Sequence, residues 1–158
     1  MKAATVKELK QELSTRSHKE LLEICLRLSR FKKENKELLT YLLFESFDET
    51  AYILNVKKEI DEQFEQINRK SYFYIRKSIR KILSGTKKFA RYSQKKETEV
   101  ELLIYFCLKL KNFQPSIHKS AALQNIYIRQ VELIKKTVEQ LHEDLQFDYE
   151  SDLNKLLH

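Results

Sequence analysis

Glycine and proline, the residues that most often interrupt helices, occur once each in this chain of 158 residues, as Gly85 and Pro115. Charged residues make up 34% of the chain, and apolar residues recur at spacings of three and four. This pattern favours an almost wholly helical protein. We expect an all-α, single-domain bundle of about seven helices of unequal length over residues 1–158, with irregular helical-repeat packing as an alternative. A chain of this length buries about 70% of its unfolded surface and needs neither disulfides nor metal for its core.

Two features of the sequence predict a cytoplasmic protein without a membrane partner. The first ten residues lack the apolar segment of a signal peptide. The longest unbroken apolar run, Leu102–Leu108, is far shorter than the roughly 20 residues of a membrane span. Cys25 and Cys107 have neither redox nor zinc spacing and are interpreted as reduced core residues.

Three segments match the capping box, in which a Ser or Thr precedes a Glu by three residues at a helix start. They are Thr5–Glu8, Ser17–Glu20 and Ser46–Glu49. The third helix along the chain contains the run 38–44, which is apolar on most sides and is therefore expected to be buried. The helix that begins near Ser46 is predicted to reach about Asn68, with a seam at Ile53, Val56, Ile60, Phe64 and Ile67.

Later segments supply the predicted core. Residues 96–112 have few polar gaps and are the best candidate for a central helix, which ends before Pro115. A final long helix is predicted to continue to about Gln146. Its heptad seam fits either the domain's own core or a coiled-coil dimer, and comprises Tyr127, Val131, Ile134, Val138, Leu141 and Leu145.

The most distinctive stretch, Arg69–Lys96, holds eleven Lys or Arg residues and no Asp or Glu. The remainder of the chain has 19 basic and 23 acidic residues, so all net positive charge lies in this stretch. On a helix, most of the cations share one face, and aromatic side chains lie among or beside them. The candidate residues for binding an anion, a nucleic acid or an acidic partner are Arg76, Lys77, Arg80, Lys81, Lys88, Arg91, Phe73 and Tyr92.

Three alternatives compete with a binding role for this stretch. Lysine-rich helix faces often serve solubility alone. Gly85 is able to end the helix and so divide the row of cations into two patches. Nearby carboxylates also offer neutralisation, either from residues 59–65 or from the acidic C-terminal segment, residues 139–158. That segment carries six Asp or Glu between Glu139 and Asp152, and it fits the basic face of the same molecule or of a second one.

No catalytic signature is evident in the sequence. Glu139 and His142 have the Glu-x-x-His spacing of carboxylate-bridged metal sites, but no second pair exists. One glycine is too few for a phosphate-binding loop. We therefore expect no enzyme activity, cofactor, metal or small-molecule substrate.

The opening of the chain resembles an uncharacterised family of small bacterial helical proteins. The resemblance covers about the first 45 residues and rests on Lys7-Glu-Leu9, Glu20-Leu-Leu22 and Lys33–Leu39. It implies a helical fold and no particular activity. The same opening is similar to SAP-type DNA-binding helix-turn-helix domains, although these have a longer connecting loop with a glycine where this chain has Ser14–Ser17.

Together these features predict a non-enzymatic cytosolic protein that acts as a protein-interaction or scaffolding module, with a protein partner or self-association. The alternative is nucleic-acid binding, with the cations of residues 69–96 as phosphate contacts and aromatic side chains for stacking.

Overall fold

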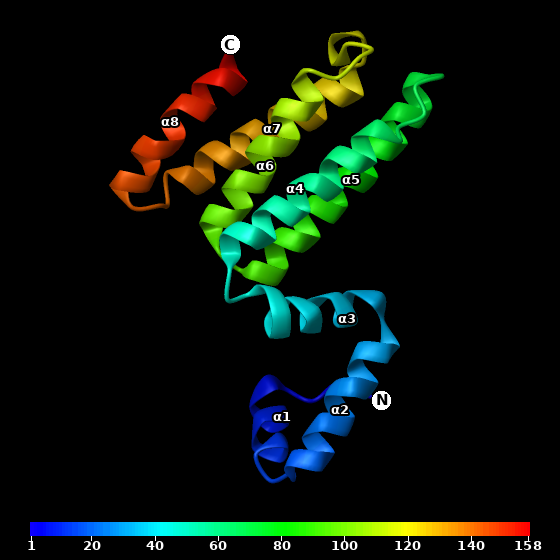
Figure 1. The fold of residues 1–158 in the computed structure, drawn as a ribbon, viewed down its shortest axis with the longest axis vertical. Coiled ribbons are helices and arrows are strands. Elements are labelled where there is room, and N and C mark those ends of the chain that lie inside the picture. Colours follow the sequence, from blue (N-terminus) through cyan, green and yellow to red (C-terminus); the bar gives the residue numbers. More distant parts are fainter. The chain divides into compact units, whose positions relative to one another are not determined.

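Eight α-helices, a π-helical turn and a 3-10 turn make up the computed structural model, which describes residues 1–158. The all-α prediction is confirmed, with one helix more than expected. No helix combines the length and the hydrophobicity that a membrane span requires. The contacts divide the chain into two compact units, residues 1–44 and 45–158, at a position where the sequence indicated no boundary (Figure 1).

The N-terminal unit contains α1 (Val6–Leu13), α2 (His18–Phe31) and α3 (Lys33–Thr40), and the π turn Tyr41–Glu45 begins at its end. The two capping boxes predicted for this unit both form. The backbone N–H of Thr5 donates to Glu8 at 2.7 Å, and that of Ser17 donates to Glu20 at 2.8 Å. These helices therefore begin where the sequence placed them.

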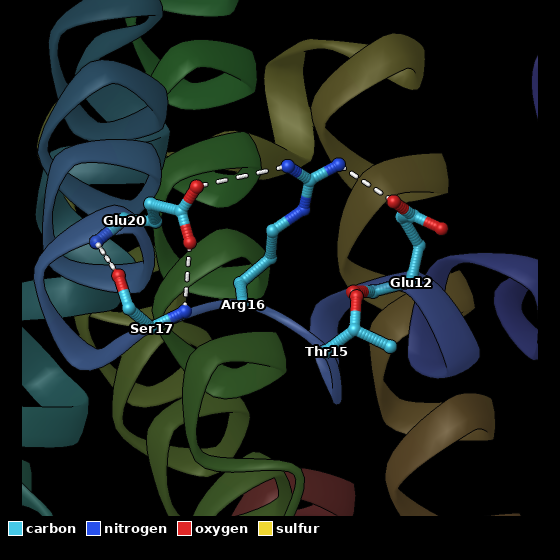
Figure 2. Close-up of polar contacts among 5 residues, drawn as sticks. All are labelled: Glu12, Thr15, Arg16, Ser17 and Glu20. Carbon is cyan, nitrogen blue, oxygen red and sulfur yellow. Dashed lines mark hydrogen bonds and ion pairs between the residues drawn. The ribbon is translucent and has the colours of Figure 1, made fainter.

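Arg16 joins the end of α1 to the start of α2. Its guanidinium lies 2.6 Å from Glu12 Oε1 and 3.8 Å from Glu20 Oε1, while Glu20 also accepts from the N–H of Ser17 (Figure 2). The backbone and side-chain hydrogen bonds from Ser17 hold the pKa of Glu20 below its ordinary value, and Arg16 adds to the effect. Polar contacts, more than packing, thus define this connection.

Burial in the N-terminal unit departs from the prediction. Cys25 and most of the apolar run 38–44 were expected in a core, yet Cys25 is exposed and Tyr41 is the buried apolar side chain of that run. Ser29 is the other buried residue of the unit. Three short helices are too few to surround their own apolar faces, so these faces lie at the surface.

The C-terminal unit is arranged around α6 (Lys96–Lys111), as predicted. Eight of its residues are buried, and Phe106 packs on Phe64 of α4 (Glu49–Glu65) with ring centroids 5.8 Å apart. The predicted seam from Ile53 to Ile67 is buried throughout, although α4 ends at Glu65 and Ile67 follows it. Helix α4 lies antiparallel to α5 (Tyr72–Ser93), and both pack against α6 (Figure 1).

The third predicted capping box does not form. Asp48 caps α4 instead, accepting from the N–H of Ala51 at 3.0 Å. The Glu49 carboxylate accepts hydrogen bonds from the hydroxyls of Ser93 and Thr98, the latter at 2.7 Å. Lys95 Nζ lies 3.4 Å from its other oxygen. Glu49 thus joins the start of α4 to the end of α5 and the start of α6.

The predicted final helix is two helices, which accounts for the additional element. After the 3-10 turn Ile117–Lys119, α7 runs over Ala121–Val138 and α8 over Glu143–Leu157. The Gln146 amide donates to the carbonyls of Glu139 and Leu141 at 3.3 and 2.8 Å, and so satisfies carbonyls of the turn that follows α7. The predicted heptad seam therefore stops near Val138.

Candidate functional site

The basic residues of the C-terminal unit lie on one continuous helix, because α5 runs through Gly85. The helix ends at Gln94, which has a left-handed conformation with φ of 60°. Gly85 has no positive φ, and a Cβ added there meets nothing within 4 Å. The alternative of two shorter patches is therefore wrong.

Helix α5 separates an apolar inner side from a charged outer side. Ile75 and Ile79 are fully buried against the neighbouring helices. The candidate cations divide by exposure, since Arg76 and Lys88 are half-buried, whereas the exposed members are Lys77, Arg80, Lys81 and Arg91. We call the set Arg76, Lys77, Arg80, Lys81, Lys88 and Arg91 the basic face.

Carboxylates of α4 leave most of the basic face without an ion pair. Asp61 instead lies 2.7 Å from Lys109 Nζ and accepts from the Tyr105 hydroxyl at 2.8 Å, both on α6. Burial opposes ionisation of Asp61, but the hydrogen bonds from Lys109 and Tyr105 outweigh it and lower its pKa. Five members of the basic face form no ion pair, namely Arg76, Lys77, Arg80, Lys81 and Arg91.

The acidic C-terminal segment also leaves the basic face uncovered. Helix α8 packs on α6 and α7, on the side of α6 away from α4 and α5 (Figure 1). Its end is held by two hydrogen bonds, from Lys111 Nζ to the carbonyl of Lys155 at 2.7 Å and from the Tyr127 hydroxyl to that of Leu156 at 2.6 Å. No hydrogen bond or ion pair joins α8 to α5.

The aromatic residues at the two ends of α5 differ in accessibility. Phe73 is 63% exposed and meets Tyr74 edge-on at 5.5 Å between ring centroids. Tyr92 is half-buried, with its ring 6.0 Å from that of Phe89. Phe73 and Tyr74 therefore offer more ring surface to a ligand than Tyr92 does.

A second candidate surface, which the sequence analysis missed, lies in the N-terminal unit. A groove of about 240 Å³ separates α2 from α3, with Ser29 on its floor. Asn35 Nδ2 donates to the carbonyl of Leu28 at 2.8 Å and holds the two helices together beside it. We call this the α2–α3 groove, and its lining residues are Cys25, Leu28, Ser29, Asn35, Leu38, Leu39 and Leu42. The spacing of apolar residues in the sequence indicated the apolar faces of these helices, but it did not indicate that the faces remain exposed in the folded chain.

No group of three or more His, Cys, Asp or Glu side chains has a metal-binding arrangement. Burial raises the pKa of the Cys107 thiol to about 12, so this sulfur stays protonated at neutral pH. A cavity of about 480 Å³ between α4 and α6 is lined by Tyr105 and Lys109, and both are engaged by Asp61.

Comparison with protein families, curated proteins and solved structures finds no match for this chain. The resemblance of the first 45 residues to a bacterial helical family therefore stays a prediction.

Proposed function

We propose that the protein is a protein-interaction module whose N-terminal unit binds an apolar helix face of a partner protein. One observation carries the proposal: eleven large apolar side chains between Val6 and Phe44 are at least 37% exposed. At roughly 100 Å² each they present about 1,000 Å², compared with about 800 Å² per partner in a standard protein–protein interface.

The α2–α3 groove supplies the shape that such a surface needs. Four of its lining residues are leucines, and Ser29 and Asn35 have hydrogen bonds within the unit. A partner that enters the groove therefore displaces water from apolar side chains without breaking buried polar contacts. The polar network around Arg16 fixes the connection between α1 and α2 before any partner arrives.

Site-specific cross-linking from Cys25 tests the proposal. Cys25 is exposed at the groove and Cys107 is buried, so a maleimide carrying a photo-cross-linker labels Cys25 selectively. After irradiation in an extract of the source cells, we expect a discrete protein adduct that excess unlabelled chain removes by competition.

Two competitor variants make this test specific. A Leu28→Glu/Leu42→Glu competitor, charged within the groove, should leave the adduct intact. A Lys33→Glu/Lys36→Glu competitor, charged beside the groove on α3, should remove it as the wild type does. An adduct that both variants remove equally, or no discrete adduct, would contradict the proposal.

Nucleic-acid binding by the basic face is a second candidate, favoured by a separate observation. Five cations of α5 have no carboxylate partner, and exposed Phe73 and Tyr74 lie at the same end as Lys77. Lys77 and Arg91 are fourteen positions apart, which corresponds to about 21 Å along the helix. Cations over this length match a stretch of phosphate backbone, and the rings offer stacking for bases.

Fluorescence anisotropy with labelled single-stranded and duplex oligonucleotides tests this candidate at two salt concentrations. Five phosphate contacts to a single strand predict a fall in affinity of about 100-fold between about 50 and 200 mM salt. Arg80→Glu/Lys81→Glu should abolish binding, while Lys33→Glu/Lys36→Glu, with the same charge change in the other unit, should not. Absence of binding at the lower salt would eliminate this candidate.

A further inference from the structure

A third surface, opposite the basic face, carries the complementary charge. The outer side of α8 exposes four carboxylates, Glu143, Asp144, Asp148 and Glu150, around Phe147, which is itself 76% exposed. At 100° per residue, the four lie within about 100° of Phe147 on the helix. We call this set the acidic face.

A groove borders the acidic face. It has a volume of about 330 Å³, lies between α7 and α8, and has apolar side chains on both sides, with Val138 from α7 and Phe147 and Leu153 from α8. Lys135 is the one cation among its lining residues. This α7–α8 groove has room for an aromatic side chain, the type of anchor that concentrates binding energy at interfaces.

We propose that the basic face of one copy of this chain docks on the acidic face of a second copy, with Phe73 entering the α7–α8 groove beside Phe147. The two helices lie on opposite sides of α6 and share no hydrogen bond or ion pair within one molecule (Figure 1). Their charges therefore meet only between copies, where Lys77, Arg80 and Lys81 oppose the carboxylates around Phe147.

Such a contact joins two different surfaces, so a bound pair still offers one free basic face and one free acidic face. Head-to-tail contacts of this type produce rings if the rotation closes and open chains if it does not. The contact uses neither the α2–α3 groove nor the apolar surface of the N-terminal unit, so this inference stands apart from the interaction proposed there.

A complementation experiment tests the contact on the full-length chain after nuclease treatment, by sedimentation velocity across a concentration series at about 50 and 300 mM salt. Wild type should associate at the lower salt and dissociate at the higher, because the Debye length falls from about 14 to about 6 Å. Arg80→Glu/Lys81→Glu alone and Asp148→Lys/Glu150→Lys alone should both be monomeric. Their equimolar mixture should associate again, since the intact basic face of one variant meets the intact acidic face of the other.

Two further variants separate this contact from others. Phe73→Ser should weaken association about tenfold, whereas Leu28→Glu/Leu42→Glu should leave it unchanged. A monomeric wild type at low salt, or a mixture that stays monomeric, would overturn the proposal. Association that requires nucleic acid, or that is lost in the Leu28→Glu/Leu42→Glu variant, would also overturn it, because the copies would then meet through a polyanion or through the N-terminal unit.

Discussion

Glu49→Ala is expected to destabilise the C-terminal unit strongly, although Glu49 lies at the start of a helix. Its side chain is 17% exposed and accepts from the hydroxyls of Ser93 and Thr98, of which Thr98 is almost fully buried. Hydrogen bonds to a charged acceptor contribute about 1.5–3 kcal/mol each, and the half-exposed Lys95 adds at most about 1 kcal/mol. Because the two hydroxyls lose their acceptor, we expect the free energy of unfolding to fall by about 3–4 kcal/mol.

Urea unfolding, monitored by tyrosine fluorescence, measures this change in the free energy of unfolding. Of the eight tyrosines, Tyr41 alone lies within residues 1–44, so the signal reports mainly on the C-terminal unit. With a slope of about 1–3 kcal/mol per molar urea, the midpoint should fall by about 1 M or more. Glu59→Ala, at an exposed position of the same helix, is the matched control and should stay within about 0.5 kcal/mol of wild type.

A double-mutant cycle between Glu49 and Thr98 distinguishes the loss of their hydrogen bond from a general disturbance of α4. Thr98→Val should cost at least about 1 kcal/mol less in the Glu49→Ala background than in wild type, because the hydroxyl has already lost its acceptor. Equal costs in the two backgrounds, or a loss for Glu49→Ala no larger than that for Glu59→Ala, would refute the reasoning.

Three further outcomes follow from single positions. Gly85→Ala should stabilise the protein by up to about 1 kcal/mol in thermal or urea unfolding, because the site is mid-helix and a Cβ has free space; destabilisation would contradict a continuous α5. A thiol reagent at about pH 8 should modify Cys25 alone in the native protein and both cysteines in urea, as mass spectrometry would show, because burial raises the pKa of Cys107 to about 12. Hydrogen bonds from Ser17 lower the folded pKa of Glu20. The stability that this carboxylate contributes is therefore fully present above the ordinary pKa of 4.5 and is lost as the pH falls through the folded pKa. Below about pH 4.5, the Glu20→Gln variant should therefore lose less N-terminal helicity than wild type, as monitored by NMR. An unchanged acid transition would count against the capping contact.

Local signals in the sequence predicted helix starts better than helix ends. The pairs Thr5–Glu8 and Ser17–Glu20 each place an acceptor three residues before a Glu, and both boxes form. The third pair fails because Asp48 accepts from the N–H of Ala51, while Glu49 reaches α5 and α6. Its partners, more than forty positions away, lie outside any local pattern.

The end of α7 had no marker in the sequence, since no glycine or proline lies between Val138 and Glu143. The chain turns there because Gln146 satisfies carbonyls near the end of α7 and His142 Nδ1 accepts from the N–H of Asp144 at 3.3 Å at the start of α8. Both contacts need the turn already formed. Spacing along α7 alone therefore suggested a longer heptad seam than exists.

The basic face could be assigned from sequence because its residues belong to one helix, and the 100° rotation per residue places them together once α5 is continuous. The acidic face could not be placed, since its location depends on where α8 packs. That packing is tertiary, through Tyr127, Lys111 and the buried Leu156. The separation of the two charged faces is therefore a property of the fold.

The N-terminal unit shows why an amphipathic pattern does not by itself predict burial. Val6, Leu9 and Leu13 recur on one face of α1, which indicates a side to be covered but not what covers it. A unit of 44 residues lies near the size at which chains generally need disulfides, metals or association to hold a core. The exposed apolar surface of this unit, more than the charge of α5, is therefore the feature on which the proposed function rests.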